Sequence, residues 1–284
     1  MRWRGRTGSE HVEDRRGAPG GRGMGLPLGG GVGGIVLLLV ISFITGQNPL
    51  ELMNALGPAA GGVETGGAPV DDTPESQMVS VVLRHTEDTW STIFEQRGEQ
   101  YPPPVLVLFS GSTESACGLG QSAMGPFYCP GDRKVYLDLS FFEDLDRRFG
   151  APGDFAQAYV VAHEVGHHIQ TVTGMSDRVQ TMRQRGDERD GNALSVRQEL
   201  QADCYAGVWG FYAAQDGLLE PGDAEEGLRA AAAIGDDRLQ QQSQGRVVPE
   251  SFTHGSSEQR VTWLRRGLSE GRLDACDTFR GTID

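Results

Sequence analysis

Residues 154–173 read DFAQAYVVAHEVGHHIQTVT, an otherwise apolar segment that contains the pattern His-Glu-x-x-His. Gly174 follows, as is typical of the position after a helix. On a helix, His163 and His167 lie one turn apart on the same face, so both can reach one metal ion. Glu164 is adjacent to the first histidine and can reach a water molecule bound to that ion. The segment predicts a zinc site with His163 and His167 as ligands and Glu164 as the catalytic base.

A catalytic zinc ion needs a third protein ligand, and residues 195–207 offer one. This segment reads SVRQELQADCYAG, and the capping pattern of Ser195 and Gln198 predicts that a helix begins here. Glu199 and Asp203 then share one face of that helix. Glu199 can complete a His-His-Glu site of the thermolysin type, and Asp203 can accept the outer N–H of a ligand histidine. The alternatives are histidines that only form buried hydrogen bonds and carboxylates that only face solvent.

Two further histidines have other predicted roles. His254 stands in the sequence FTHGSS, in a loop before a helix whose start is indicated by Ser256 and Gln259. It is the alternative third ligand, but we expect it to hydrogen-bond the anionic oxygen of the tetrahedral intermediate. An ordinary loop histidine is the remaining interpretation. His168 lies about 100° around the helix from His167, so we expect it behind the ligands or on the surface.

The N-terminal third predicts an anchored protein. Residues 1–23 are polar and rich in arginine, which predicts a disordered basic tail. Residues 24–46 carry no charge and match the roughly 20 residues that cross a bilayer, with a cleaved signal peptide as the alternative. Residues 47–75 are rich in Gly, Ala and Pro and predict a flexible linker before a folded domain at residues 76–284. Since positive flanks stay in the cytoplasm, we predict a single-pass protein of the bacterial cell membrane, with a cytoplasmic N-terminus and an extracytoplasmic catalytic domain.

The patterns after the linker predict an α+β fold that is mostly helical with a small β-sheet. Residues 105–109 are typical of a buried strand, and residues 134–139 of a strand that offers its edge to an extended peptide. Helices are expected at residues 79–94, 154–173, 196–215, 223–243 and 257–270.

The formal net charge of −14 argues against nucleic acid as a partner, because an acidic domain repels phosphate.

Several blocks of the sequence resemble the bacterial YpfJ-like neutral zinc metallopeptidases. The resemblance runs almost end to end, and it departs from the family pattern at His11, where Asn is expected, and at Ser256, where Thr is expected. It implies a zincin-like peptidase domain with bound Zn²⁺, preceded by one transmembrane helix, and it names no substrate. The blocks are Val12–Arg16, Cys117–Gly118, Gly125–Pro130, Val135–Leu139, His163–His168, Glu199–Cys204, Ala233–Leu239, Phe252–Gly255 and Cys276–Phe279.

The four cysteines permit three pairings, and export from the cytoplasm would favour disulfides. Cys117 and Cys129 bracket a segment that is typical of a loop, so we predict a bridge between them. A second predicted bridge, between Cys204 and Cys276, would clamp the C-terminal segment against the helix that carries Glu199. The alternative is a buried free thiol at Cys204.

These residues predict zinc-dependent hydrolysis of a peptide or protein substrate. Glu164 would take a proton from water and pass it to the leaving amine, with His254 as a helper. Two alternatives remain, of which the first belongs to another class of protein. One is a membrane-tethered binding module with structural zinc, for which His254 would be the fourth ligand. The other is a metal-dependent amidase that acts on cell-wall peptide.

Overall fold

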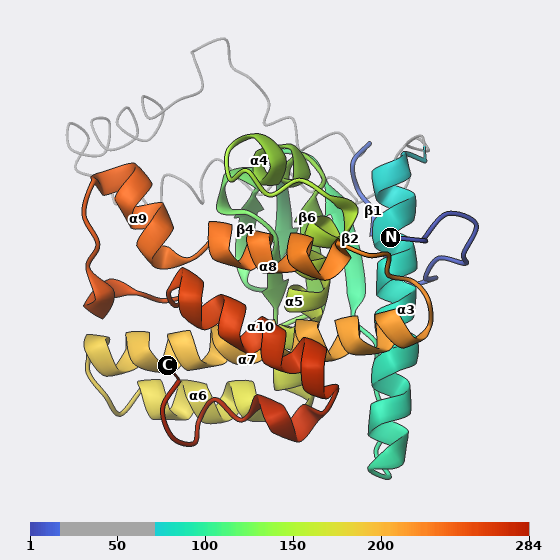
Figure 1. Ribbon diagram of the computed structural model, residues 1–284. Coiled ribbons are helices and arrows are strands. Elements are labelled where there is room, and N and C mark those ends of the chain that lie inside the picture. The colour runs from blue at the N-terminus through green and yellow to red at the C-terminus, as the bar shows by residue number, and fades with distance from the viewer. Residues whose placement is uncertain (18–71, 284) are drawn as a thin grey trace, which may run out of the picture. The chain divides into compact units, whose positions relative to one another are not determined.

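The structure is a computed structural model that describes residues 1–17 and 72–283. This part of the chain is mostly helical with a small sheet, which confirms the predicted α+β class (Figure 1). The helices are α3 (Pro74–Gln96), α4 (Phe141–Arg147), α5 (Asp154–Val172), α6 (Met175–Arg183), α7 (Glu188–Gln215), α8 (Asp223–Ala233), α9 (Asp236–Gln244) and α10 (Ser257–Glu270). The strands are β1 (Val12–Asp14), β2 (Val105–Phe109), β3 (Ser112–Ser115), β4 (Gly118–Gln121), β5 (Phe127–Cys129) and β6 (Lys134–Asp138). Short 3-10 helices are η1 (Ser122–Met124), η2 (Pro249–Ser251) and η3 (Leu273–Cys276).

The main sheet has four strands in the order β1-β2-β6-β5. β2 pairs in parallel with β1 and β6, and its sequence VLVLF is almost entirely buried, as is usual for a parallel strand. β5 pairs antiparallel with β6 and ends the sheet on that side, while β3 and β4 form a separate ribbon. The strand predicted at residues 134–139 is therefore the interior strand β6. β2 occupies one edge of β6 along its whole length, and β5 occupies the other edge over residues 134–136. The prediction that the edge of this strand receives a peptide is therefore wrong for those residues.

The N-terminal residues belong to the folded unit. β1 extends the main sheet, and the side chain of Trp3 is buried. The amino group of Met1 lies 2.9 Å from the carboxylate of Asp154, the first residue of α5. The prediction that residues 1–23 form a disordered tail is therefore wrong for residues 1–17, because sheet pairing and charged contacts hold them to the rest of the fold.

The predicted membrane segment, residues 24–46, and nearly all of the predicted linker lie outside the described residues. Within residues 1–17 and 72–283, no helix has the length and apolar character that crossing a bilayer requires. In addition, β1 and β2 flank this segment in the sequence and pair in one sheet, whereas a single span between them would separate them across the membrane. These findings overturn the prediction of a single-pass membrane protein with a cytoplasmic N-terminus and an extracytoplasmic domain.

Helix α5 lies between the sheet and the other helices, where it packs against α3, α7 and α8 (Figure 1). It ends as predicted, because Gly174 adopts a φ of 73° that favours glycine. Gly166 permits a close approach of α7, since a Cβ atom at this position would lie 2.9 Å from the carbonyl oxygen of Ala202. This contact brings the turn of α5 that carries His163 beside the turn of α7 that carries Glu199.

Two helix boundaries differ from the predictions. Helix α7 begins after the N-cap Asp187, whose side chain accepts a hydrogen bond from the backbone of Asp190. The capping pattern at Ser195 therefore lies inside a helix and marks no boundary. The helix predicted at residues 223–243 is two helices, α8 and α9. The chain turns at Gly235, where a Cβ atom would lie 2.4 Å from the backbone nitrogen of Ser257, the first residue of α10.

Both predicted disulfides are present, so all four cysteines are bonded. The Cys117–Cys129 bridge joins the turn of the β3–β4 ribbon to the end of β5, across a Cα–Cα distance of 5.8 Å. The Cys204–Cys276 bridge joins α7 to η3 across 5.5 Å. The second bridge thus fixes the C-terminal segment to the helix that carries Glu199.

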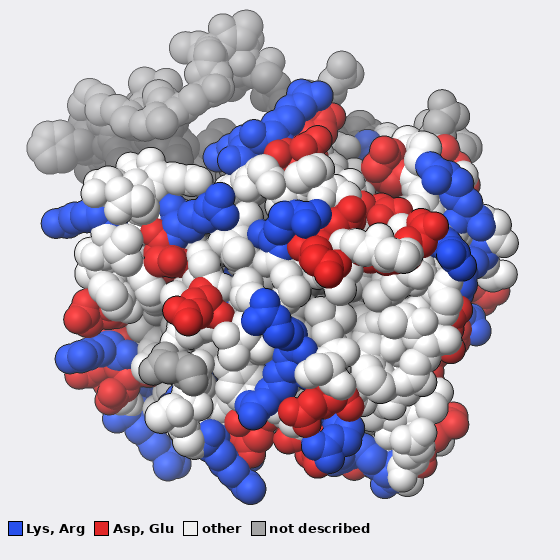
Figure 2. Space-filling view, in the orientation of Figure 1, with Lys and Arg blue, Asp and Glu red and all other residues white. Residues whose placement is uncertain are grey.

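The surface carries charges of both signs. On the face shown in Figure 2, acidic and basic side chains lie close to one another. Ion pairs one helical turn apart also occur on the surface, such as Arg266 with Glu270 at 3.6 Å. Exposed pairs of this kind contribute little to stability.

Candidate metal centre

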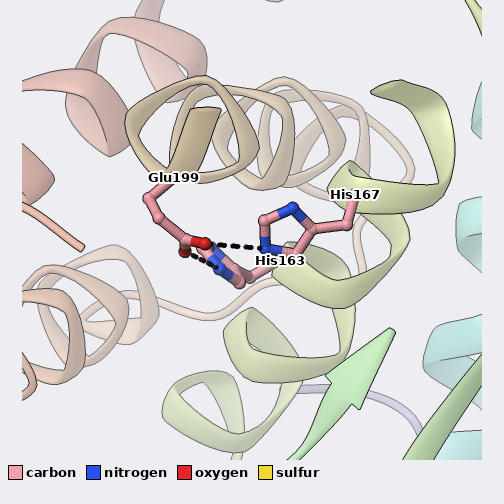
Figure 3. A group of neighbouring side chains, drawn as sticks. All are labelled: His163, His167 and Glu199. Carbon is pink, nitrogen blue, oxygen red and sulfur yellow. Dashed lines mark hydrogen bonds and ion pairs between the residues drawn. The ribbon is translucent and has the colours of Figure 1, made fainter. Parts of the chain in front are cut away.

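Three side chains from α5 and α7 converge on one point (Figure 3). His163 and His167 project from successive turns of α5, and Glu199 projects toward them from α7. Nε2 of His163 lies 3.1 Å from Oε2 of Glu199, and Nε2 of His167 lies 3.5 Å from Oε1. One donor atom of each residue lies within 4.8 Å of the other two. The structure therefore brings together the three residues that the sequence indicated as ligands.

This donor set fits a zinc ion. Donors of a tetrahedral zinc site lie about 3.3 Å apart when each is about 2.0–2.1 Å from the ion. The distances of 3.1 and 3.5 Å between the nitrogen and oxygen donors are close to that spacing. Two imidazoles and one carboxylate are also the ligand set of catalytic zinc sites that keep one position open. The geometry and the chemistry of the donors therefore agree.

The outer nitrogens of both histidines are held by acceptors. Nδ1 of His163 donates to Oδ1 of Asp203 at 2.8 Å, and Nδ1 of His167 donates to Oε1 of Gln170 at 3.0 Å. With a metal ion at Nε2, the neutral His163 ring would carry its hydrogen on Nδ1, where the carboxylate of Asp203 accepts it. Each ring then presents Nε2 toward Glu199, which is the arrangement that metal-binding histidines use.

Asp203 is the centre of a buried polar network. Its side chain is 0% exposed and also accepts hydrogen bonds from the hydroxyl of Tyr159 at 2.6 Å and from the guanidinium of Arg260 at 2.9 and 3.0 Å. Burial raises the pKa of Asp203, but the charges of Arg260 and His163 outweigh burial and lower this pKa to about 2. The carboxylate is therefore ionised throughout the neutral range.

The charges of neighbouring groups shift the pKa values of the donors. Burial lowers the pKa of His163, but Asp203 and Glu199 outweigh burial and raise this pKa to about 10. Burial raises the pKa of Glu199, and the charges of the two histidines outweigh it and hold the pKa well below its usual range. A metal ion that binds these donors must displace protons from the imidazoles.

Glu164 lies at the wall of a cleft of about 650 Å³ that also reaches the three donors. Its side chain is largely buried, and within the described part of the chain we find no hydrogen bond or ion pair of its carboxylate. The ring nitrogens of His163, its neighbour in the sequence, contact Asp203 and Glu199 instead. Glu164 is thus available to exchange protons with a molecule in the cleft, as the predicted base requires.

His254 also lines this cleft, from the loop before α10. Its Nδ1 lies 3.2 Å from Oδ1 of Asp236, whose Oδ2 accepts the backbone N–H groups of Thr253 and His254 at 2.7 Å. The Asp236 carboxylate raises the pKa of His254, burial opposes this effect, and the charge of Glu199 adds to it. His254 is outside the group of converging donors, so the geometry favours Glu199 as third ligand and His254 as a hydrogen-bond donor in the cleft.

His168 points away from the metal centre and is fully buried. Its Nε2 donates to the carbonyl oxygen of Pro102 at 2.6 Å, and its Nδ1 accepts from the hydroxyl of Tyr128 at 3.1 Å. Burial lowers the pKa of His168 to about 4, so the ring is neutral. The sequence placed His168 either behind the ligands or on the surface, and its burial shows that the surface location is wrong. This histidine connects α5 to the edge strand β5.

The cleft has an apolar wall on the side of α4. Met124, Phe141 and Phe149 line it, and the side chain of Met124 is 70% exposed. The two phenylalanine rings lie 6.4 Å apart. Phe127 and Tyr128 of the edge strand β5 line the same cleft. An extended chain with large apolar side chains could therefore contact both a strand edge and an apolar surface here.

Three residues of the site were not found by sequence analysis, namely Tyr159, Gln170 and Arg260. Tyr159 lies one helical turn before His163, and Gln170 lies three residues after His167, so helical spacing could have indicated both. Arg260 lies on α10, separated from its partner Asp203 by 57 positions. Only the tertiary structure reveals that pair, because no sequence pattern connects the two segments.

The family model described as "Putative neutral zinc metallopeptidase" matches residues 1–279, so the chain belongs to this family. "Uncharacterized protein YpfJ" of Escherichia coli K12 is 50% identical over 288 residues, which cover 100% of both chains. "Uncharacterized protein Mb2605" of Mycobacterium bovis is 48% identical over 190 residues, which cover 63% of each chain. No solved structure matches the chain.

These comparisons confirm the resemblance that the sequence blocks indicated. Zinc, the predicted cofactor, is the metal of this family. The zincin-like fold stays a prediction, because the chain matches no solved structure with which its fold could be compared.

Proposed function

We propose that this protein is a zinc peptidase that hydrolyses peptide bonds in the cleft between α4, α5 and β5. The observation that carries the proposal is the convergence of His163, His167 and Glu199 beside the carboxylate of Glu164 in one cleft. Three protein donors with access from a cleft are typical of a catalytic zinc site, whereas a structural site is usually closed by a fourth. Membership of the neutral zinc metallopeptidase family supports the same reaction class.

In this mechanism Glu164 moves the protons. A zinc ion held by the three donors would supply Lewis-acid chemistry that acidifies water and polarises a carbonyl group. Glu164 takes a proton from the attacking water, which then adds to the peptide carbonyl carbon. The protonated Glu164 next transfers this proton to the leaving amine as the C–N bond breaks. A carboxylate at the cleft wall, with no hydrogen bond to another residue of the described part of the chain, suits this exchange.

His254 and Asp236 form the second element of the mechanism. Asp236 accepts from Nδ1 of His254, which leaves Nε2 available in the cleft. The imidazolium can donate a hydrogen bond to the oxygen that becomes negative in the tetrahedral intermediate. The strand edge of β5 and the apolar wall of Met124, Phe141 and Phe149 would hold the peptide on either side of the reacting bond.

The proposal is tested with a library of fluorescence-quenched peptides and the full chain loaded with zinc. We expect cleavage by the wild type and a loss of about 10²- to 10⁴-fold in kcat for Glu164→Gln. Zinc content is measured in parallel, and Glu164→Gln should retain it, because Glu164 is no ligand. Absence of peptide cleavage by the zinc-loaded wild type, with cleavage of cell-wall peptides alone, would indicate an amidase instead. No cleavage of either substrate by a stably zinc-loaded chain would indicate a binding module.

A further inference from the structure

Arg260 reaches the back of the metal centre from α10. Its guanidinium is buried, with 4% of the side chain exposed. Nε donates to Oδ2 of Asp203 at 2.9 Å, and Nη2 donates to Oδ1 at 3.0 Å. Nη2 also donates to the hydroxyl of Tyr159 at 3.1 Å, and Nη1 to the carbonyl oxygen of Ile234 at 3.3 Å. The planar guanidinium is therefore held by three partners, and its contact with the carboxylate of Asp203 is bidentate.

This contact determines how Asp203 faces the metal centre. Oδ1 of Asp203 accepts from three donors, which are His163 at 2.8 Å, Tyr159 at 2.6 Å and Arg260 at 3.0 Å. Rotation of the carboxylate would break the contact between its two oxygens and the guanidinium. With the carboxylate fixed, the hydrogen bond to Nδ1 also fixes the plane of the His163 ring. The position of the donor Nε2 therefore depends on a residue of a third helix.

Stability alone does not account for this buried ion pair. Removing two charges from water is costly, and apolar residues of similar size often stabilise a protein as well or better. Asp203 could have its charge compensated by any nearby cation, yet the pair is aligned with the ligand His163. We propose that Arg260 is a positioning residue, which fixes Asp203 and through it orients His163 for metal binding. The inference rests on the proposed role of His163 as a zinc ligand.

The test measures zinc dissociation constants of the full chain by competition with a chelator. Arg260→Lys keeps the positive charge but lacks the planar fork, so the protein should fold and bind zinc about 10-fold more weakly. Arg265→Lys is the matched control, because Arg265 is exposed on the same helix, and its zinc affinity should equal that of the wild type. Thermal unfolding of the zinc-free proteins shows whether the fold itself has changed. Wild-type zinc affinity in Arg260→Lys would overturn the inference.

A double-variant cycle separates positioning from a general structural effect. If Arg260 acts through Asp203, then Arg260→Lys should change zinc affinity by less than about 2-fold in a chain that already carries Asp203→Asn. A full 10-fold loss in that background would overturn the inference, because it would show that Arg260 acts by another route. These measurements need no peptide. A chain that shows the expected zinc affinities without peptide cleavage would refute the proposed function and leave this inference standing.

Discussion

Nδ1 of His167 donates a hydrogen bond to Oε1 of Gln170 at 3.0 Å, so a neutral amide supports this ring while a carboxylate supports His163. Gln170 is fully buried and donates from Nε2 to the carbonyl oxygen of Gln198 at 2.6 Å and to the side chain of Gln201 at 3.2 Å. Since both of those oxygens accept, the amide of Gln170 can only present its oxygen to His167. The two ligand histidines are thus oriented by different parts of α7.

Substitution of Gln170 by leucine tests this support. Leucine has a similar size but cannot accept the hydrogen of Nδ1, so zinc affinity should fall by about 10- to 100-fold. The partners left without a donor should also lower the free energy of unfolding by about 1–3 kcal/mol. Chelator competition and thermal unfolding measure the two effects. Gln180→Leu, at an exposed position of α6, is the control, and equal zinc affinities of the two variants would contradict the prediction.

The three proposed ligands should be separable from the base. His163→Ala, His167→Ala and Glu199→Ala each remove one of three donors, so each variant should lose most of its zinc after dialysis. Glu164→Gln should keep a wild-type content, as measured by elemental analysis. Removal of zinc from the wild type by a chelator should abolish peptide cleavage, and added zinc should restore it. Full zinc occupancy in Glu199→Ala would show that Glu199 is not a ligand, and His254 would then be the candidate for the third ligand.

The sequence allowed prediction of the site wherever the residues lie on one helix. The spacing of His163 and His167 is a local property of α5, and the spacing of Glu199 and Asp203 is a local property of α7. The convergence of the two helices was inferred from the chemical need for a third ligand. Arg260 could not be found in this way, because its role depends on how α10 crosses α7.

Boundary and topology predictions failed where a local signal competed with tertiary contacts. Ser195 has the residue type of a helix cap, but its hydroxyl bonds the carbonyl oxygen of Gly191 inside α7. The polar composition of residues 1–23 predicted disorder, yet β1, which lies within them, is ordered by its pairing with β2. Such pairing involves distant segments and leaves no periodicity in the N-terminal sequence itself.

The pH dependence of cleavage should report on His254. Because Asp236 raises its pKa, the imidazolium form persists to higher pH than in an ordinary histidine. If that form stabilises the negative oxygen, kcat/KM should fall as the pH rises through this raised pKa. Asp236→Asn removes the charge that raises the pKa, so the alkaline limb of the profile should move to lower pH. A limb at the same pH in wild type and Asp236→Asn would contradict the assignment.

The pair of His254 and Asp236 should stabilise the fold more at low pH than at high pH. A histidine whose pKa is higher in the folded than in the unfolded state stabilises the fold fully below the unfolded pKa and loses this effect as the pH rises through the folded pKa. The difference in unfolding free energy between wild type and His254→Gln should therefore be larger in mildly acidic than in alkaline buffer. Urea unfolding of both proteins at the two pH values measures this difference. It also shows how much of the pH dependence of cleavage comes from a change in stability.

The apolar wall of the cleft should set the preference for the substrate. Phe149→Ala removes one of the two aromatic rings, so cleavage of peptides with a large apolar side chain beside the reacting bond should fall by about 10- to 100-fold in kcat/KM. Peptides with small side chains should be affected much less, and zinc content should not change. The measurement is a comparison of cleavage profiles over the same peptide library. An unchanged profile would mean that the wall does not contact the substrate.

The Cys204–Cys276 bridge should matter more for stability than Cys117–Cys129. Its cysteines are 72 positions apart, against 12 for the other bridge. The chain-entropy model gives about 4 kcal/mol for the longer loop and about 3 kcal/mol for the shorter one. Cys204→Ala with Cys276→Ala should therefore lower the free energy of unfolding more than Cys117→Ala with Cys129→Ala, as measured by urea unfolding of the zinc-free proteins.

Loss of the longer bridge should also reach the metal centre. The backbone carbonyl of Cys276 accepts from Nε2 of Gln201 at 2.9 Å, and Gln201 accepts from Gln170, which supports His167. When η3 is released from α7, this chain of hydrogen bonds loses its anchor, so zinc affinity should fall by several-fold. The Cys117→Ala, Cys129→Ala variant is the matched control, because its bridge joins the β3–β4 ribbon to β5, includes no residue of α5 or α7, and should leave zinc affinity unchanged. Equal zinc affinities in both double variants would show that Gln170 holds its orientation without the bridge.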